Sequence, residues 1–416
     1  MEQRIITVPQ LAWHGPKELE LSFPAEWDLE VLHMQGRNRP VLSPEEIRRA
    51  VVNPSYGPPL RELANCKDEV AIIFDDLTRV TRAAKIIPFL LEELAIAGVP
   101  DERVRFIAAL GCHGALSRSD LVKKLGADVV SRFAVYNHNA FENCTYVGTT
   151  SGGIPLYVNA EVMSCSLKIG VGVITPHIMT GFGGGGKIVL PGIVSLETAE
   201  AFHNIEKDAG KRRAGQKGNT GMGVFENNPL QREIAEAVKM VGLDFKVDCL
   251  VNYWGEIVAI FAGSPQQAFA AGAAEAKKHY LTPSAADADI VVANNYAKAS
   301  EAVVGLFTPC GIAREKDYDL VLICNTPDGQ APHFLMGTFG KESAGRLRLE
   351  VRVPPAVRNF IVFNEYPEYA ARGYFADPEK IFFTRTWEET LFLLKKWHGR
   401  QARVAIYPDA SIQYSL

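Results

Sequence analysis

The chain has 416 residues, 47% hydrophobic and 22% charged, with a formal net charge of −4. These values are typical of a globular protein with two or three domains, and the mildly acidic balance argues against nucleic-acid or membrane binding, since both require clustered basic residues. The cysteines form no C-x-x-C pair and no signal peptide is recognisable, so we expect a cytoplasmic protein with reduced thiols.

Near-continuous apolar runs alternate with amphipathic segments along the chain. The apolar runs predict buried strands at residues 69–74, 104–110, 167–174, 289–293 and 318–324. The amphipathic segments predict helices at residues 84–98, 117–126, 228–242 and 264–280. This alternation predicts an α/β fold with largely parallel sheets.

A domain boundary is expected in the segment LTPSAA at residues 281–286, which follows an alanine-rich helix and precedes a new strand. We therefore predict two α/β domains, residues 1–280 and 281–416, with an active-site cleft between them.

Polar or glycine-rich loops follow the predicted strands. They are DDLTR (75–79), GCHG (111–114), TPH (175–177), NNYAK (294–298) and NTPDG (325–329). In parallel α/β sheets ligands bind beyond the carboxyl ends of the strands, so these loops are where binding and catalytic residues are expected.

The segment GFGGGGKIVLPG (181–192) has the G-x-x-x-x-G-K spacing of a phosphate-binding P-loop. A P-loop requires Ser or Thr after the lysine, and this chain has Ile188; Pro191 would also end a helix begun at Lys187. A nucleoside triphosphatase is therefore disfavoured. Four consecutive glycines still predict positive φ angles or a close approach of the backbone to a ligand, and their N–H groups could form an anion-binding nest.

Three histidines lie near the predicted strand ends or around Lys187. His177 precedes the lysine by ten residues, His203 follows it by sixteen, and His113 lies at a separate strand end. A neutral histidine can act as a general base or as a metal ligand, and two of them on opposite sides of a substrate carbon could serve inversion of a stereocentre. Taken singly, each histidine could equally be structural. We expect His138 to bridge or cap a loop.

The loop DDLTR carries two carboxylates, a hydroxyl and a guanidinium at a strand end. Carboxylates in this position can hold ribose hydroxyls, and Thr78 with Arg79 suits a phosphate or carboxylate. A helix cap with a surface ion pair is the alternative interpretation.

Taken together, DDLTR, ALGCHG, PHIMTGFGGGGKIVLPG and AFH resemble the successive motifs of the nickel-pincer nucleotide-dependent lactate racemase family, whose members are 2-hydroxy-acid racemases and epimerases. They span roughly residues 70–205. The resemblance implies that Lys187 is joined covalently to the nickel-pincer nucleotide (a nickel(II) pyridinium-3,5-bisthiocarboxylate mononucleotide) and that His203 binds its metal. It also implies a cofactor contact by the segment Asp76, Leu77, Thr78 and Arg79. The glycines would then let the backbone lie against this bulky cofactor.

The reaction implied by the resemblance is inversion at C2 of a 2-hydroxy acid, with His113 and His177 as the acid/base pair. One histidine takes the hydroxyl proton while hydride leaves C2 for the cofactor, and hydride then returns to either face of the 2-keto acid. Proteins that make the cofactor are implied as partners.

The chain departs from the family pattern at two places. Gly114 stands where lactate racemases tend to have an arginine, which favours a different or larger substrate such as a sugar acid. The run NNYAK replaces a Gly-Gly-Tyr-Pro-like motif; here we expect Tyr296 and Lys298 to bind substrate, Lys298 through the carboxylate, while Asn294 and Asn295 could contact further hydroxyls.

Two other functions stay open at this point. A nicotinamide-dependent oxidoreductase is disfavoured because no G-x-G-x-x-G follows a predicted strand with an acidic residue about twenty positions later. A catalytically inactive nucleotide-binding protein of the same fold would need neither Lys187 nor His203.

Overall fold

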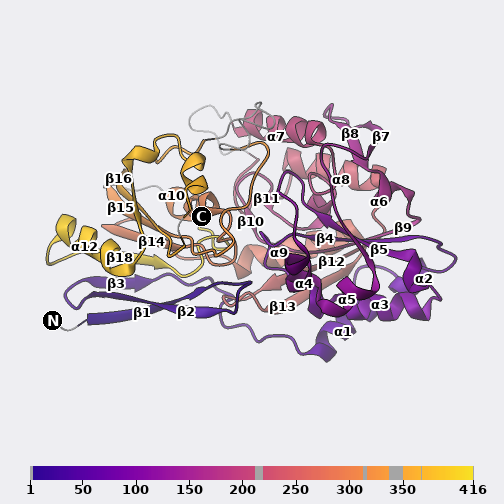
Figure 1. Cartoon of the computed structure of the whole chain (residues 1–416), viewed down its shortest axis with the longest axis horizontal. Coiled ribbons are helices and arrows are strands. Elements are labelled where there is room, and N and C mark those ends of the chain that lie inside the picture. The colour runs from indigo at the N-terminus through magenta and orange to yellow at the C-terminus, as the bar shows by residue number, and fades with distance from the viewer. Residues whose placement is uncertain (1–2, 211–218, 313–315, 337–349, 367, 416) are drawn as a thin grey trace. The chain divides into compact units, whose positions relative to one another are not determined.

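The computed structural model describes residues 3–210, 219–312, 316–336, 350–366 and 368–415, and the chain forms two compact units (Figure 1). One unit is Arg39–Lys278, and the other combines Met1–Asn38 with His279–Leu416. The division at residues 280 and 281 expected from the sequence differs from this at the N-terminus. The beginning of the chain belongs to the second unit because strand β3 (Asp28–Val31) pairs with β18 (Arg403–Tyr407).

The unit Arg39–Lys278 is built on a six-stranded sheet in which only the pair β12–β13 is antiparallel. In spatial order its strands are β13 (Ile257–Gly263), β12 (Phe245–Val251), β9 (Leu167–Val173), β4 (Val70–Asp75), β5 (Val104–Ala109) and β6 (Ala134–Asn137). The predicted strands at 69–74, 104–110 and 167–174 are thus confirmed, and they are adjacent, in the order β9-β4-β5.

The described part of this unit has the helices α1 (Pro44–Val52), α2 (Leu60–Leu63), α3 (Ile87–Ile96), α4 (Arg118–Leu125), α5 (Ala127–Arg132), α6 (Ala160–Ser164), α7 (Leu196–Gly210), α8 (Pro229–Val241) and α9 (Pro265–His279). Four of them, α1, α4, α6 and α8, begin after a residue whose side chain caps them. Helix α4 has a capping box between Ser117 and Asp120, and α8 begins after the Asn228 cap and ends at Gly242 in the left-handed conformation. Two short antiparallel pairs complete the unit: β7 (Cys144–Thr149) with β8 (Pro155–Asn159), and β10 (Pro176–His177) with β11 (Gly181–Phe182).

The other unit has a six-stranded, fully parallel sheet. In spatial order its strands are β17 (Ile381–Thr384), β16 (Val357–Phe363), β15 (Tyr318–Ile323), β14 (Ile290–Asn294), β18 and β3. The predicted strands at 289–293 and 318–324 are β14 and β15. The described part of this unit also includes the hairpin β1 (Gln3–Gln10) with β2 (Lys17–Pro24), and helices α10 (Phe307–Cys310) and α12 (Trp387–His398). The α/β class with largely parallel sheets is therefore confirmed in both units.

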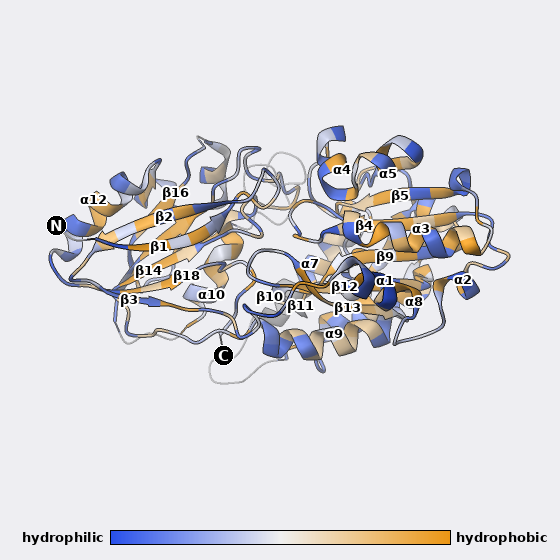
Figure 2. Ribbon diagram, turned by 90° about the horizontal axis from the view of Figure 1, so that it is seen from below, coloured by the Kyte–Doolittle hydropathy of each residue, from blue (hydrophilic) through white to orange (hydrophobic). Residues whose placement is uncertain are grey.

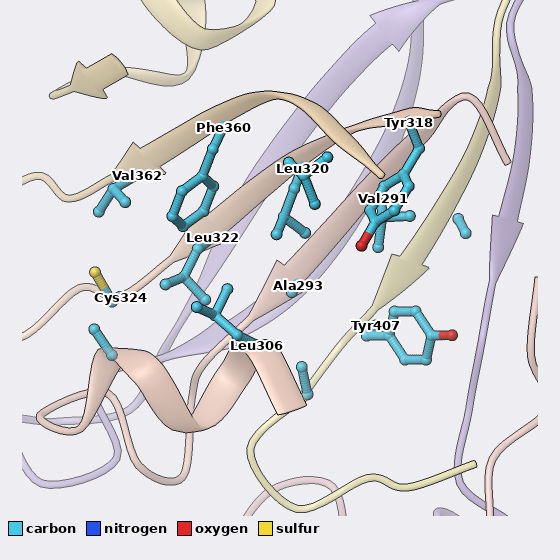
Figure 3. Close-up of a cluster of buried hydrophobic side chains, with 14 of the residues drawn as sticks. Val291, Ala293, Leu306, Tyr318, Leu320, Leu322, Cys324, Phe360, Val362 and Tyr407 are labelled. Atoms are coloured by element: carbon cyan, nitrogen blue, oxygen red, sulfur yellow. The ribbon is translucent and has the colours of Figure 1, made fainter. Parts of the chain in front are cut away.

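Alternate residues of the central strands enter two different cores in this second unit. Val291, Leu320 and Leu322 belong to one cluster, part of which is shown in Figure 3. Their neighbours Val292 and Val321 belong to the other, which includes Trp27 after the β1–β2 hairpin and Trp387 of α12. Because both faces are covered, the central strands are apolar over most of their length, and the hydropathy colouring in Figure 2 shows them largely in orange.

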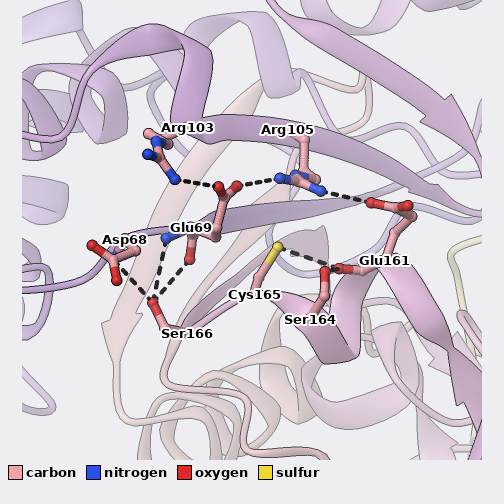
Figure 4. A network of polar contacts seen from close by, with 8 residues as sticks. All are labelled: Asp68, Glu69, Arg103, Arg105, Glu161, Ser164, Cys165 and Ser166. Atoms are coloured by element: carbon pink, nitrogen blue, oxygen red, sulfur yellow. Dashed lines mark hydrogen bonds and ion pairs between the residues drawn. The ribbon is translucent and has the colours of Figure 1, made fainter.

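A polar network lies at the amino-terminal end of the sheet in the unit Arg39–Lys278 (Figure 4). Glu69, just before β4, pairs with Arg103 at 2.7 Å and with Arg105 of β5, and Arg105 also pairs with Glu161 at 2.6 Å. Ser166, just before β9, accepts the N–H of Asp68 at 3.2 Å. These contacts fasten the strand starts, whereas the loops with candidate catalytic residues follow the strand ends.

Within the described part of the chain, we find no helix with both the length and the apolar character needed to cross a membrane.

Candidate functional site

Three adjacent parallel strands of the unit Arg39–Lys278 lead into three of the predicted site loops. Strand β4 ends at Asp75 and is followed by Asp76, β5 leads to His113, and β9 leads to His177. Because β5, β4 and β9 are hydrogen-bonded neighbours running in one direction, these three loops leave the same edge of the sheet.

His113 is held by Asp76. Its Nδ1 lies 2.6 Å from the Asp76 Oδ2, and the two side chains are only 14% and 5% exposed. Burial tends to raise the pKa of Asp76, but the positive charge that His113 can carry and its hydrogen bond, together with Arg79 and Thr78, hold that pKa well below its usual range. Asp76 is therefore an ionised acceptor at neutral pH. Its other oxygen accepts the backbone N–H of Thr78 at 2.9 Å and the Thr78 hydroxyl.

The loop DDLTR (75–79) is held in place by Lys124 of α4, a fully buried lysine. Its Nζ donates to the carbonyls of Asp76 and Arg79, both at 2.8 Å, and pairs with the Asp75 carboxylate at 2.6 Å. The Arg79 guanidinium donates to the Thr78 hydroxyl at 2.8 Å, and Leu77 is half-buried. These hydrogen bonds and the ion pair hold the charged side chains of the loop in defined positions. The contact of the loop with a cofactor stays a prediction.

His177 and Lys187 come together. The Lys187 Nζ lies 3.4 Å from the His177 Nε2 and 5.7 Å from the centre of the Phe202 ring. The other ring nitrogen of His177, Nδ1, accepts the backbone N–H groups of Met179 and Thr180, each at 3.2 Å. His177 is therefore oriented by the tight turn that connects β10 to β11.

His203 follows Phe202 on α7 and is oriented by its own helix. Its Nδ1 lies 2.6 Å from the carbonyl oxygen of Ala199, one turn earlier. A carbonyl only accepts, so Nδ1 carries the proton and the lone pair of the neutral ring is on Nε2. A histidine that binds a metal through one nitrogen requires such a partner on the other, and the sequence did not identify it.

The loops of His113 and Lys187 are joined by the backbone. Gly111 N–H donates to the Gly192 carbonyl at 2.8 Å. Gly111 has φ +55°, and a Cβ there would lie 3.2 Å from the Pro191 carbonyl oxygen, so glycine permits this contact. The loop after β5, which carries His113, is therefore hydrogen-bonded directly to the end of the segment GFGGGGKIVLPG.

The glycines at 184–186 pack closely against the protein itself, and a contact of this run with a cofactor stays a prediction. A Cβ on Gly185 would overlap the Phe269 ring of α9, and one on Gly186 would overlap the Val238 side chain of α8. Gly185 is also in the left-handed region, with φ +54°. The segment forms a single 3₁₀ turn, Gly185–Ile188, instead of the start of an α-helix, so the P-loop interpretation is excluded.

We expect Gly185→Ala to destabilise the protein by about 2–4 kcal/mol, because the new methyl group meets Phe269 at a positive φ. The measurement is urea unfolding. Gly183→Ala is the matched control, since a Cβ there would lie 3.7 Å from the nearest atom, the Thr175 carbonyl oxygen. Equal stability of the two variants would contradict the assigned packing.

Two buried ion pairs lie beneath these loops. Asp248 of β12 and Lys246 are fully buried and 2.6 Å apart, and Asp248 also accepts the N–H of Gly185 at 3.0 Å. Asp248 is aligned with Gly172 of β9, and a Cβ on Gly172 would lie 3.4 Å from the Asp75 carboxylate on the next strand. We call Asp75, Lys124, Lys246 and Asp248 the buried charge row. Sequence reasoning missed it, although the spacing of Lys246 and Asp248 puts both on one face of a strand.

His138 is structural, as expected. Its Nε2 donates to the Val194 carbonyl at 2.8 Å and its Nδ1 accepts the Asn159 amide at 3.1 Å, which joins the end of β6 to the segment before α7. Burial, only partly opposed by the Val194 carbonyl, lowers the pKa of His138 from 6.5 to about 4.

We expect His138 to make stability pH-dependent. Its pKa is lower in the folded state (about 4) than in the unfolded chain (6.5), so the unfolded state binds more protons in this window and stability falls as the pH falls. Unfolding in urea at pH 7.5 and 4.5 should differ by about 2–3 kcal/mol more in the wild type than in His138→Gln. His33, in the other unit, titrates similarly and is the same in both proteins. An identical pH dependence would contradict the prediction.

Tyr296 and Lys298 follow β14 in the other unit and are buried, 2% and 4% exposed. Their loop is held by Asp409, which accepts the N–H of Ala297 at 3.2 Å. Burial raises the pKa of Asp409 to about 7, against the hydrogen bonds from Ser411 and Ala297 and the charge of Lys298. Tyr296 and Lys298 belong to a different unit from His113 and His177, and a site that combines the four residues stays a prediction.

The amides of Asn294 and Asn295 are used within the protein. Asn294 Nδ2 donates to the carbonyls of Pro9 and Pro408 at 2.8 and 2.7 Å, and its Oδ1 accepts from Gln10 at 2.6 Å. Asn295 Nδ2 donates to the Lys298 and Glu301 carbonyls at 2.8 and 3.0 Å. Asn294 is completely buried, so the expectation that it contacts substrate hydroxyls is wrong.

Comparison with known proteins shows which proteins this chain is similar to. Residues 14–215 match the lactate racemase N-terminal domain, Lar_N. The chain is 31% identical over 288 residues to a lactate racemase of Thermoanaerobacterium thermosaccharolyticum, covering 68% of this chain and 65% of that protein. It is 30% identical over 254 residues to a lactate racemase of Lactiplantibacillus plantarum, covering 60% of this chain and 58% of that protein. The matched stretch thus spans slightly less than two thirds of these relatives.

Solved structures agree on the fold. The lactate racemase apoprotein from T. thermosaccharolyticum superposes with a TM-score of 0.72 at 22% identity, covering 99% of this chain and 100% of that one. A protein from Thermotoga maritima superposes with a TM-score of 0.63 at 19% identity, covering 90% and 98%. The chain described here is thus similar to lactate racemases in sequence, with the N-terminal domain match over residues 14–215, and shares their fold.

Proposed function

We propose that this protein is a racemase or epimerase that inverts C2 of a 2-hydroxy acid, with a nickel-pincer nucleotide tethered at Lys187. The observation that carries the proposal is the grouping of Lys187 with His177, 3.4 Å apart, beside the helix that presents His203. The similarity to lactate racemases supports an isomerase of this kind.

The metal-binding side chains of the protein fit a metal ion whose other ligands come from the cofactor. Among the residues that the structure describes, no group of three or more His, Cys, Asp or Glu side chains could hold an ion alone. A bisthiocarboxylate group offers sulfur donors, and His203 would add one nitrogen, Nε2, with its ring fixed through Ala199. Lys187 would hold the same group by a covalent bond. When bound, the group supplies a reversible acceptor for the hydride of C2.

The chain's own residues handle the proton of the substrate hydroxyl. His113 and His177 are the acid/base pair of the proposal, and Asp76 orients the ring of His113. Asp76 to Arg79 would contact the nucleotide, with Arg79 as the cation for its phosphate. In the other unit, Lys298 would bind the substrate carboxylate beside Tyr296.

The substrate is proposed to be larger than lactate. Gly114 follows His113 directly, and the arginine that the related racemases tend to carry there would fill space and add charge. A 2-hydroxy acid with a longer polar chain, such as a sugar acid, would use that space. Cytoplasmic location and dependence on cofactor-making proteins are part of the same proposal.

The proposal is tested by producing the protein in a host that supplies the cofactor and measuring intact mass and nickel content. A mass adduct with about one nickel per chain supports it. A panel of 2-hydroxy acids of graded size is then followed for conversion of one stereoisomer to the other by chiral chromatography. Protein with neither adduct nor nickel from such a host would indicate a nucleotide-binding protein without this chemistry.

A further inference from the structure

The turn that carries Lys187 depends on its surroundings for its conformation. Four glycines (183–186) precede the lysine, and Gly184 and Gly185 have positive φ angles of 86° and 54°. Glycine has the most backbone entropy to lose on ordering, so a run of four keeps one conformation only where neighbouring groups hold it. Phe269 and the side chains of α8 provide apolar contacts to this run.

A directional contact with the same turn comes from Asp248 of β12. Its two carboxylate oxygens lie 3.2 and 3.0 Å from the Gly185 nitrogen, and the side chain is completely buried. A hydrogen bond from a backbone N–H to a carboxylate is about twice as strong as one between neutral groups. Gly185 and Lys187 belong to one 3₁₀ turn, so this bond orients the backbone from which the lysine side chain extends.

Asp248 belongs to the buried charge row, which also reaches the loop DDLTR. Lys246 pairs with Asp248 at 2.6 Å. The Lys246 Nζ and the Asp75 carboxylate both adjoin Gly172, where a Cβ would lie 3.2 and 3.4 Å from them. Asp75 is the first residue of DDLTR and pairs at 2.6 Å with Lys124, whose Nζ also donates to two carbonyls of that loop. Charges of alternating sign therefore connect the turn of Lys187 to DDLTR through the interior of the unit.

We propose that Asp248 is a positioning residue for the covalent tether: it orients the turn of Lys187, and the buried charge row holds this turn in a constant position relative to the loop DDLTR. By the proposed function, on which this inference rests, DDLTR contacts the nucleotide of the cofactor and Lys187 is bonded to the same molecule. A single molecule held at both places requires that their separation stay constant, and a connection through the interior provides this.

The first experiment measures the turn in protein made without the cofactor, by backbone hydrogen exchange of peptides that cover residues 181–192. Two double variants remove both buried charges, so that neither is left unpaired. Lys246→Met with Asp248→Asn keeps an acceptor for the Gly185 N–H, whereas Lys246→Met with Asp248→Leu removes it. We expect exchange of this N–H to be about 10-fold faster or more in the leucine variant than in the asparagine variant. Equal exchange in the two variants would overturn the proposal.

The second experiment follows formation of the adduct, which requires no assay of turnover. Each protein, purified without the cofactor, is mixed with an extract of the host that supplies it, and intact mass is read over time. The leucine double variant should acquire the adduct about 10-fold more slowly than wild type or worse, while the asparagine double variant should stay within about 3-fold of wild type. Equal rates in the two double variants would show that the acceptor at residue 248 has no positioning role.

Asp244→Leu is the matched control for a merely structural effect. Asp244 lies just before β12, at the end opposite the candidate site, and accepts the backbone N–H of Lys168 at 2.8 Å. Its loss should lower the free energy of unfolding in urea but leave the rate of adduct formation unchanged. If Asp244→Leu slows the adduct as much as the leucine double variant does, adduct formation follows stability alone and the proposal is wrong. Wild type that acquires no adduct would instead count against the proposed function, and hydrogen exchange would still decide whether Asp248 holds the turn.

Discussion

Replacing Lys187 by alanine is expected to abolish the covalent adduct and to lower the rate of stereoisomer conversion by about 10³-fold or more, because an untethered group must be bound and oriented anew in every molecule. Intact mass, nickel content and chiral chromatography measure the adduct, the bound nickel and the rate on the same preparation. Lys187→Arg should behave like alanine, since its guanidinium keeps the charge but is a poor nucleophile near neutral pH.

Lys239→Ala is the control for this experiment. Lys239 is an exposed lysine of α8, and its loss should leave the adduct, the nickel and the rate unchanged. An adduct that persists in Lys187→Ala would place the tether at another residue. Since the glycines at 184–186 pack against the chain's own helices and core, Lys187 should keep its position before the cofactor arrives.

Replacing His113 by alanine is expected to lower the rate of stereoisomer conversion by about 10²–10⁴-fold while leaving the adduct in place, because the base is lost and the tether is not. His177→Ala should also lower the rate strongly, because the second member of the proposed acid/base pair is lost. Chiral chromatography gives the rate and intact mass gives the adduct.

The matched control is His14→Ala. His14 lies in the other unit, where its Nε2 pairs with Asp328 at 2.6 Å, and it has no part in the proposed chemistry. If both His113→Ala and His177→Ala keep the wild-type rate with a full adduct, neither residue handles the proton and the mechanism proposed here is wrong.

The strands and helices were predictable because their signals are local. Runs such as 70–74 are apolar throughout since both faces of the sheet are covered, and α8 begins after its Asn228 cap and ends at Gly242. The placement of residues 1–38 was not predictable, because it depends on pairing β3 with β18 at the far end of the chain. Periodicity within a strand does not reveal its distant partner.

The glycine run shows what a local signal leaves open. Four glycines predict that something approaches the backbone closely, and this is correct, but the sequence does not say what. The approaching groups are Phe269 and the side chains of α8. The histidines show the same limit, since their types and spacing predicted a site, while Asp76 and Ala199 became visible as their partners only in the folded chain.

The buried charge row has a consequence for how this scaffold can evolve. At Gly172 any side chain would enter the space between Asp75, Lys246 and Asp248. Its bulk would separate these buried charges from one another, and burial would keep water from solvating the separated charges. Gly114, in contrast, lies on a loop and is half-buried. Substitutions are therefore easier to accommodate at Gly114 than at Gly172, where they would disturb the buried charge row.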